Sequence, residues 1–224
     1  IPEDCDVTVI KVEDTRYAMA FISAAYFGHP AKEMKIIGIT GTKGKTTTTY
    51  LIKSILEAAG YKVGLVGTIE VIIGDLHIPA NNTTPESFLL QKYFRQMKDA
   101  GCDIVVMEVA SQGLKLHRTQ GFLFEIGIFT NLESDHIGPN EHADFAEYLQ
   151  CKGLLFKQCK LGIVNGDDAH VKEVLKGHTC QVETYGFDSS ADLYAEDLQL
   201  VDKPGELGVS FAVKGQMDFM VEVP

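Results

Sequence analysis

The feature that most constrains the fold is a short apolar segment that runs directly into a glycine-rich loop and then into a helix. The apolar segment is Lys35–Thr40, the loop reads Gly-Thr-Lys-Gly, and the apolar periodicity predicts a helix over residues 45–59 that ends at Gly60. Glycines let backbone N–H groups approach an anion, and the start of a helix adds partial positive charge. This order is typical of a phosphate-binding loop between a strand and a helix.

Lysine and threonine at the start of the predicted helix supply the rest of the phosphate chemistry. Lys45 is placed to reach the outer phosphates of a nucleotide, and the Thr46 hydroxyl is placed to bind Mg²⁺. The usual spacing, G-x-x-x-x-G-K-T, requires glycine at position 39, where this chain has Ile39. An ordinary glycine-rich turn between a strand and a helix remains the alternative. The predicted phosphate-binding residues are Gly41, Thr42, Lys43, Gly44, Lys45, Thr46 and Thr47.

A carboxylate is expected near this loop to hold Mg²⁺, directly or through water. Glu108 lies at the end of the apolar run 102–109, which is typical of a buried parallel strand. Burying a carboxylate costs free energy unless a cation accompanies it, which favours a metal ligand at this position. The alternative is a glutamate at the end of a strand that faces solvent.

The rest of the chain alternates strand-like and helix-like segments, which predicts a doubly wound α/β domain with a mostly parallel sheet. Further strands are predicted at residues 7–12, Val63–Val66, 126–130 and 161–165, and further helices at residues 85–100, 142–159 and 169–177. Residues 192–223 read as strands broken by turn signals, which predicts a small antiparallel meander at the C-terminal end.

Charge and composition exclude several classes of protein. The net charge of −11 argues against a general nucleic-acid binder, which needs a basic face. The sequence has no stretch long and apolar enough to span a bilayer and no signal-peptide layout at its start, so we expect a cytoplasmic protein. Its five cysteines form no C-x-x-C pair, which favours reduced thiols over a structural metal site.

Several segments resemble a known superfamily. The loop variant Thr-Gly-Thr-x-Gly-Lys-Thr-Thr resembles that of the Mur ligases and folylpolyglutamate synthetases. Further segments narrow the resemblance to the UDP-N-acetylmuramoyl-tripeptide synthetase (MurE) type of Mur ligase. These are Val-Glu-Asp-Thr-Arg at residues 12–16, Tyr-Phe-Gly-His-Pro at 26–30, Asn-Thr-Thr-Pro-Glu at 82–86, Glu-Val-Ala-Ser-Gln-Gly-Leu at 108–114, Thr-Asn-Leu at 130–132, Asp-His at 135–136 and Asn-Gly-Asp-Asp at 165–168.

The resemblance implies a division into domains. The family has a uridine-nucleotide domain, a central ATP-binding domain and a C-terminal domain that completes the sites for ATP and the amino acid. By this resemblance residues 1–32 are the end of the first domain and residues 33–224 are the central domain, with the third domain absent. The start without methionine and the end on an apolar strand also suggest a fragment, which we expect to be inactive alone.

The resemblance also implies a reaction. ATP would phosphorylate the terminal carboxylate of a UDP-N-acetylmuramoyl-dipeptide, and the amine of an amino acid would attack the acyl phosphate. Phosphate is the leaving group that a carboxylate lacks, and cations are needed where carboxylate and γ-phosphate meet. The expected cofactors are ATP and Mg²⁺, and the expected role is in peptidoglycan synthesis, and so in cell-wall biogenesis, cell shape and division.

Individual roles follow from the resemblance. Thr46 and Glu108 correspond to ligands of one Mg²⁺, and His136 to a ligand or close neighbour of a second. Asn131 is expected near the nucleotide. Lys152 corresponds to a lysine that CO₂ carbamylates, and burial beside apolar neighbours would favour the neutral amine that this reaction needs. With Lys45, His136 and Lys152 form the predicted catalytic set.

A second set is implied for the substrate, with an ordinary alternative beside each. The residues are Asn82, Thr83, Thr84, Ser111 and Arg118. Thr83 and Thr84 can cap the helix that follows them, instead of or besides binding substrate, and Arg118 can be a solvated loop side chain. Lys152 can be an ordinary helix-surface lysine, and His136 can be an ordinary surface or core residue. Ala110, Gln112 and Leu116 depart from the serine, histidine and glutamine usual in relatives, which puts the peptide contacts in doubt.

Two other functions remain open from the sequence. One is a sister ligase of the folylpolyglutamate or cyanophycin type, and the other is a non-catalytic nucleotide-binding subunit. The retained lysine, threonine, glutamate and histidine argue against the second. The sequence does not identify the amino acid that is added or the oligomeric state.

Overall fold

The computed structural model describes residues 8–135, 137–138, 142–203 and 206–223. Its centre is one eleven-stranded sheet in the order β11-β10-β9-β8-β7-β6-β1-β5-β2-β3-β4. The strands are β1 Lys35–Thr40, β2 Val63–Val66, β3 Glu70–Ile73, β4 Leu76–Pro79, β5 Ile104–Glu108, β6 Phe124–Phe129, β7 Cys159–Asn165, β8 Gln181–Gly186, β9 Leu193–Lys203, β10 Glu206–Gly215 and β11 Phe219–Val223. The middle of the sheet, from β2 to β9, is parallel, and both ends are antiparallel. The predicted doubly wound fold and the C-terminal meander are therefore confirmed.

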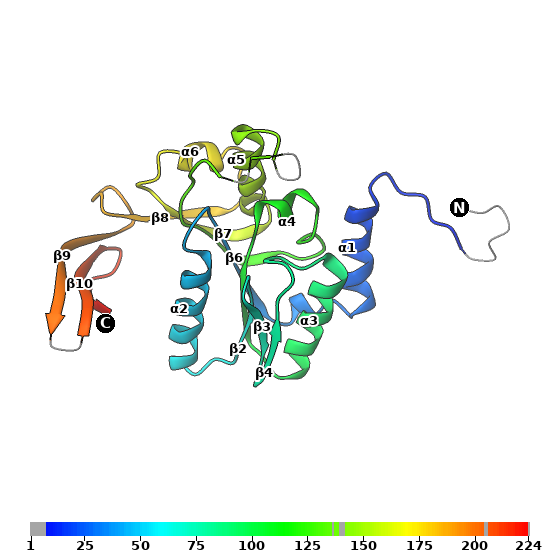
Figure 1. The fold of residues 1–224 in the computed structure, drawn as a ribbon, viewed down its shortest axis with the longest axis horizontal. Helices are drawn as coiled ribbons and strands as arrows, with labels where there is room; N and C mark the ends of the chain where they lie inside the picture. The colour runs from blue at the N-terminus through cyan, green and yellow to red at the C-terminus, as the bar shows by residue number, and fades with distance from the viewer. Residues whose placement is uncertain (1–7, 136, 139–141, 204–205, 224) are drawn as a thin grey trace.

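Helices cover both faces of the parallel strands (Figure 1). They are α1 Thr15–Tyr26, α2 Lys45–Ala58, α3 Ser87–Asp99, α4 Ser111–Lys115, α5 Phe145–Gly153 and α6 Val171–Val174, with 3₁₀ turns η1 Pro30–Lys32 and η2 Leu154–Lys157. One apolar cluster packs β1 and β5 against Ile52 and Leu56 of α2. A larger cluster fills the other face and includes Leu90 and Phe94 of α3. Among the described residues, no helix has both the length and the apolar character needed to cross a membrane.

Some predicted elements differ from the structure. The strand predicted at 7–12 is wrong for residues 8–12, which form no strand, while Val7 lies outside the described residues. The N-cap of α3 is Glu86, without a side-chain hydrogen bond, so the capping role weighed for Thr83 and Thr84 is wrong. The helix predicted over residues 142–159 is shorter in the structure. This stretch contains α5 and the 3₁₀ turn η2, and Cys159 already belongs to β7.

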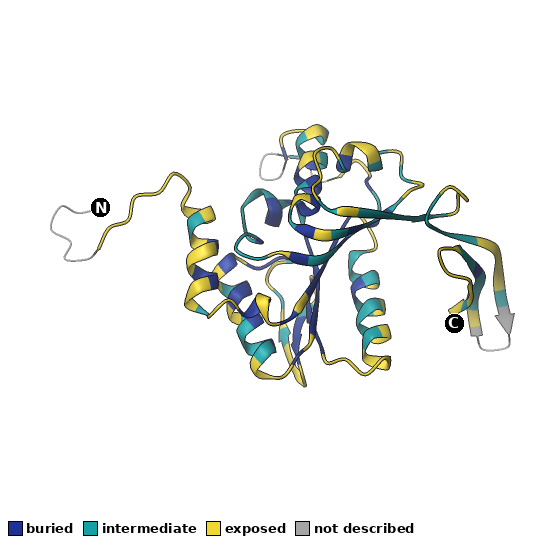
Figure 2. Cartoon of the chain, turned by 180° about the vertical axis from the view of Figure 1, so that it is seen from behind, coloured by how far each residue is buried: buried dark blue, intermediate teal, exposed yellow. Residues whose placement is uncertain are grey.

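Burial divides the molecule into a dense centre and exposed ends (Figure 2). The strands β2 and β5 are buried throughout, as expected of parallel strands with helices on both faces. The carboxyl ends of β1, β5 and β6 lie at one edge of the sheet, where a doubly wound fold binds its ligands. The loops that follow these three strands, together with the helices that those loops lead into, carry most of the predicted site residues.

Candidate functional site

The loop between β1 and α2 has the conformation that its glycines predict. Gly41 has φ +157, and a Cβ there would lie 2.0 Å from the Thr130 hydroxyl oxygen, so the position has no room for a side chain. Gly44 has φ +82 in the left-handed region and is the N-cap of α2. The loop therefore presents the N-terminus of a long helix at the carboxyl edge of the sheet, which favours an anionic ligand.

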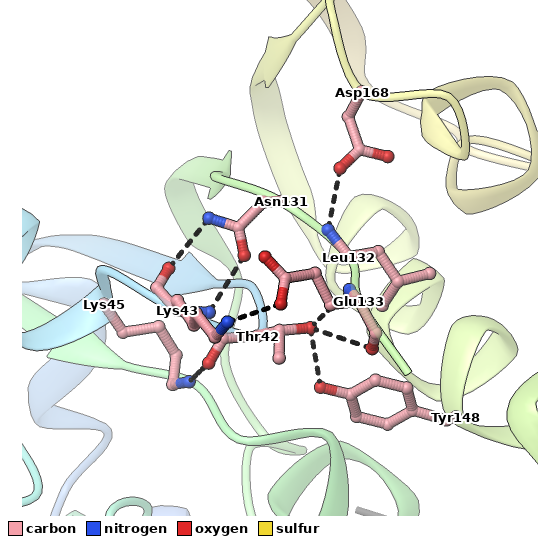
Figure 3. A network of polar contacts seen from close by, with 8 residues as sticks. All are labelled: Thr42, Lys43, Lys45, Asn131, Leu132, Glu133, Tyr148 and Asp168. Carbon is pink, nitrogen blue, oxygen red and sulfur yellow. Dashed lines mark hydrogen bonds and ion pairs between the residues drawn. The ribbon is translucent and has the colours of Figure 1, made fainter. Parts of the chain in front are cut away.

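The segment after β6 holds this loop from the other side (Figure 3). The Lys43 backbone N–H donates to Asn131 Oδ1 at 2.9 Å, and Asn131 Nδ2 donates to the Lys43 carbonyl at 3.1 Å. The Glu133 N–H donates to Thr42 Oγ1 at 3.0 Å, and Asp168 in turn accepts from the Leu132 N–H at 2.7 Å. Asn131 thus lies against the loop and fixes its backbone, while its predicted place near a nucleotide stays a prediction.

Thr46 and Glu108 form the next part of the site. Thr46 Oγ1 donates to Glu108 Oε1 at 3.0 Å, and the Glu108 side chain is buried. Its carboxylate also accepts from the Thr68 backbone N–H at 2.9 Å and from the Thr68 hydroxyl at 3.0 Å. The alternative of a glutamate turned to solvent is wrong. A hydroxyl and a carboxylate oxygen beside a phosphate loop are the hard ligands that Mg²⁺ takes, so these two residues fit such an ion.

Lys152 reaches the same loop from α5. It is 1% exposed, and its Nζ donates to the Gly41 carbonyl at 2.8 Å. Burial, followed by the charge of Lys45, lowers the pKa of Lys152 to about 7, so a neutral amine is readily available near neutral pH. The Nζ also lies 4.5 Å from the centre of the Tyr148 ring. The surface lysine weighed as the alternative is wrong.

Lys45 lies beside Lys152 and contacts the loop through its amine. Its Nζ donates to the Gly41 carbonyl at 2.9 Å and to the Thr42 carbonyl at 3.0 Å. Burial lowers the pKa of Lys45, although Glu108 and Asp135 oppose this effect. The structure therefore brings two amines to one carbonyl of the phosphate loop. Thr47, in the first turn of α2, is exposed.

The residues predicted to bind substrate lie on the neighbouring loops, and Thr84 is the most constrained. Thr84 is fully buried, donates to the Glu108 carbonyl at 3.1 Å and accepts from the Ala110 N–H at 2.9 Å. Thr83 Oγ1 lies 3.0 Å from Thr68 Oγ1, and Asn82 is exposed on the same segment. Thr84 therefore joins two loops, and Thr83 and Asn82 are the members of this segment accessible to a ligand.

Arg118 is neither a solvated side chain nor a free ligand for a carboxylate. Its Nη2 lies 2.7 Å from Glu86 Oε1, and its Nη1 donates to the Thr84 carbonyl at 3.0 Å. Arg16 binds the other oxygen of Glu86 at 2.9 Å, so one carboxylate joins α1 to this loop. A substrate carboxylate that uses Arg118 has to share it with Glu86.

The residues that depart from the family surround α4. Ala110 precedes this helix and Leu116 follows it, while Gln112 is half-buried within it. The Ala110 N–H donates to Thr84 Oγ1 at 2.9 Å. The departures therefore lie on the α4 side of the site, next to Thr84, and outside the glycine loop at residues 41–44.

Sequence reasoning missed two buried residues of α5 and the loop before it. Tyr148 is fully buried, and its hydroxyl lies 3.0 Å from Thr42 Oγ1. His142 is also fully buried, and its Nε2 lies 2.8 Å from Ser111 Oγ. The spacing of Tyr148 and Lys152, four residues apart on one helical face, was a signal that could have revealed the tyrosine.

The predicted second metal ligand, His136, lies outside the described residues. No cluster of three or more histidine, cysteine, aspartate or glutamate side chains suited to a metal occurs in the part of the chain that the structure describes. The fit to Mg²⁺ at the described residues therefore rests on Thr46 and Glu108.

Comparison with known proteins identifies the family of this chain. The sequence profile of the Mur ligase middle domain matches residues 39–224. UDP-N-acetylmuramoyl-L-alanyl-D-glutamate--2,6-diaminopimelate ligase 1 of Clostridium acetobutylicum is 47% identical over 204 residues, which are 91% of this chain and 42% of that protein. The ligase of that name from Clostridium perfringens is 42% identical over 224 residues, covering 98% of this chain and 46% of its own length. This chain thus spans less than half of the length of these curated relatives.

Solved structures show the same fold. A structure of a UDP-N-acetylmuramoyl-L-alanyl-D-glutamate--2,6-diaminopimelate ligase matches with a TM-score of 0.84 at 27% identity, covering 95% of this chain and 44% of that one. The MurF ligase of Thermotoga maritima, solved in complex with ADP, matches with a TM-score of 0.65 at 17% identity, covering 99% of this chain and 47% of its own. At that identity the second match concerns the fold alone.

Proposed function

Because this chain belongs to the Mur ligase family, we propose that it supplies the ATP-binding centre of a ligase that adds an amino acid to a UDP-N-acetylmuramoyl-dipeptide. The observation that carries the proposal is the meeting of the Lys45 and Lys152 amines on the Gly41 carbonyl, next to the Thr46–Glu108 pair. A lysine ammonium, a second and deeply buried amine, and hard oxygen ligands then surround one phosphate loop. This is the environment that transfer of a phosphoryl group to a carboxylate requires.

In this proposal the loop residues 41–47 hold the phosphates of ATP, and Asn131 keeps the loop in shape. A substrate carboxylate and the γ-phosphate repel each other, so the Lys45 ammonium stabilises the charge that develops between them. Mg²⁺, held by Thr46 and Glu108, would neutralise phosphate charge when bound. Acyl transfer to the amine then releases phosphate. Thr83, Asn82, Ser111 and Arg118 are proposed to face the dipeptide.

Lys152 is proposed to act as a carbamate. A neutral amine attacks CO₂, and the pKa of about 7 makes that form abundant near neutral pH. The product is an anion beside Lys45, which would convert two like charges into an ion pair. His136 is proposed as its neighbour at a second metal ion.

The complete reaction is proposed for a polypeptide that carries this domain with the rest of the length seen in relatives. Residues 1–32 are proposed as the end of a uridine-nucleotide domain and residues 33–224 as the central domain. We expect the 224-residue chain alone to bind ATP weakly and not to ligate. The relatives' names include 2,6-diaminopimelate, which makes it the first amino acid to test. A cytoplasmic location is part of the same proposal.

The test is ATP-dependent ligation by the full-length protein. UDP-N-acetylmuramoyl-dipeptide with diaminopimelate should give product and phosphate, whereas folate with glutamate should not. The reverse result would indicate a sister ligase of the folylpolyglutamate type. ATP binding without turnover of either substrate would indicate a non-catalytic nucleotide-binding subunit.

A further inference from the structure

A buried histidine lies between Ser111 and Glu147 and has no role in the function proposed above. His142 Nε2 lies 2.8 Å from Ser111 Oγ, and His142 Nδ1 lies 3.6 Å from Glu147 Oε2. The ring centre of His142 is 5.2 Å from that of Tyr148, whose hydroxyl contacts Thr42 of the phosphate loop. The serine, histidine and carboxylate are therefore aligned in that order next to the nucleotide site.

The surroundings of Glu147 fix which nitrogen of His142 carries the proton. Glu147 accepts from the Ala143 N–H at 2.8 Å and pairs with Lys115 at 2.9 Å, and the hydrogen bond from Lys115 is the first cause that lowers the pKa of Glu147. An ionised carboxylate can only accept, so the proton of a neutral imidazole belongs on Nδ1, which faces it. Nε2 is then an acceptor, and the Ser111 hydroxyl donates to it.

The side chain of His142 is in the neutral form that can accept a proton. Burial is the main cause that lowers the pKa of His142, with Lys115 and Lys152 acting in the same direction and Glu147 against it. The ring is therefore neutral near pH 7. The Nδ1 atom has no hydrogen-bond partner within the described ranges, and Glu147 Oε2 lies just beyond bonding distance. A proton gained at Nε2 would strengthen the attraction across that 3.6 Å gap.

Of the two residues, Ser111 is the one that keeps some exposed surface. His142 is 0% exposed and Ser111 is 4% exposed. Ser111 begins α4 beside Ala110, whose N–H donates to Thr84 of the proposed substrate segment. Because its own proton points to His142, Ser111 Oγ keeps its lone pairs for an N–H group of a ligand. An amine that reached Ser111 Oγ would meet an acceptor that is hydrogen-bonded to a base.

We propose that Ser111 and His142 form a proton relay that takes up the proton released when an amine attacks an acyl phosphate at this site. The relay rests on the proposed ligase function. The nitrogen lone pair forms the C–N bond, and the C–O bond to phosphate breaks with its electron pair leaving on phosphate. The N–H proton passes to Ser111 Oγ while the serine proton passes to His142 Nε2. Ser111 is the group that touches the amine, and His142 is the positioning residue that accepts through it.

The experiment separates the two halves of the reaction in the full-length ligase. Acyl phosphate formation is followed by positional isotope exchange in oxygen-labelled ATP with the dipeptide alone. Ligation is followed as kcat at saturating amino acid. In His142→Gln the amide oxygen can still accept from Ser111, but it cannot take the proton. We expect isotope exchange within about threefold of wild type and a ligation kcat lower by about 10²-fold, with little change in KM for the amino acid.

Two further variants make the result decisive. Ser111→Ala removes the entrance to the relay and should show the same split, which settles the question if His142→Gln does not fold. His170→Gln is the matched control, since His170 packs against Phe145 of α5 outside this cluster and should leave both steps near wild type.

Three outcomes overturn the relay. An equal fall in both half-reactions would assign His142 a structural role. An unchanged ligation kcat in His142→Gln or Ser111→Ala would show that no proton passes this way. Absence of isotope exchange in the wild type would overturn the ligase proposal itself, and the relay with it.

Discussion

The side-chain amines of Lys45 and Lys152 converge on one atom, the carbonyl oxygen of Gly41, at 2.9 Å and 2.8 Å. Two ammonium groups that share a neutral acceptor in a buried place repel each other, and the loss of solvent strengthens this repulsion. Burial accordingly lowers the pKa of both lysines, with that of Lys152 falling to about 7. Bound phosphates or a carbamate would relieve the repulsion.

Lys45→Ala should lower the kcat of the full-length ligase by about 10²-fold or more, because it removes a preorganised cation from the transferred phosphoryl group. Steady-state kinetics and circular dichroism of the purified variant are the measurements. Lys53→Ala, on the same helix and paired with Glu57, is the control and should stay within about threefold of wild type. A folded Lys45→Ala enzyme with near-native kcat would contradict the assignment.

Lys152→Ala should abolish most activity, and added short carboxylic acids should restore part of it if a carbamate is the working form. The rate is measured with and without formate or acetate, and in buffer depleted of CO₂ for the wild type. Lys157→Ala, an exposed lysine of η2, should respond to neither treatment. Full activity of Lys152→Ala without any carboxylate would rule the carbamate out.

The buried lysine should also make the stability of the folded chain depend on pH. In the unfolded chain Lys152 keeps a pKa near 10.5, and in the folded chain it is about 7. Between these values the unfolded state binds more protons, so the free energy of unfolding rises with pH from about 7 to 10.5. Below pH 7 both states are protonated and the penalty is fully present.

Urea unfolding of the wild-type chain and of Lys152→Met, in CO₂-free buffer, isolates this contribution. The stability of the wild type relative to the variant should increase by up to about 5 kcal/mol across this range, the equivalent of the shift from 10.5 to about 7. If the free energy of unfolding of the two proteins changed with pH in the same way, Lys152 would be charged in the folded state at neutral pH.

Thr84→Val should destabilise the fold by about 1–3 kcal/mol, because it leaves the Ala110 N–H and the Glu108 carbonyl without their buried partner. Thr83→Val, one residue earlier and only half-buried, should cost less than about 1 kcal/mol. Thermal unfolding of both variants tests the pair. An equal loss of stability in the two variants would show that the hydrogen bonds of Thr84 to the Ala110 N–H and the Glu108 carbonyl do not stabilise the fold.

Sequence periodicity predicted the parallel strands and α2 well, because each is a long apolar or amphipathic run with a clear end. It missed β3 and β4, the two antiparallel strands of four residues next to β2, and it also missed the helix α1. It predicted a strand at residues 7–12 because most of these residues are β-branched, although none of the described strands pairs with residues 8–12.

The sequence predicted those residues of the candidate site that belong to a recognisable motif. Gly41, Lys45, Thr46 and Glu108 follow from the loop and from the end of an apolar strand. His142 was not predictable, since a lone histidine in a polar segment has no pattern that indicates a buried partner. Its contact with Ser111 joins positions 31 residues apart, which only the packing of α4 against α5 brings together.

The register of the central strands sets limits on how chains of this kind can diverge. Ile39 of β1 is level with Glu108 of β5 and with Ile128 of β6, so the three loops that follow start at one height. An inserted residue inside any of these strands would turn the later side chains to the opposite face and displace its loop by about 3.3 Å. At the opposite edge, near Glu33 or Leu123, added residues would leave that alignment intact. Homologues should therefore vary in length in the loops that precede these strands. They should keep a fixed number of residues from the start of each strand to its carboxyl end.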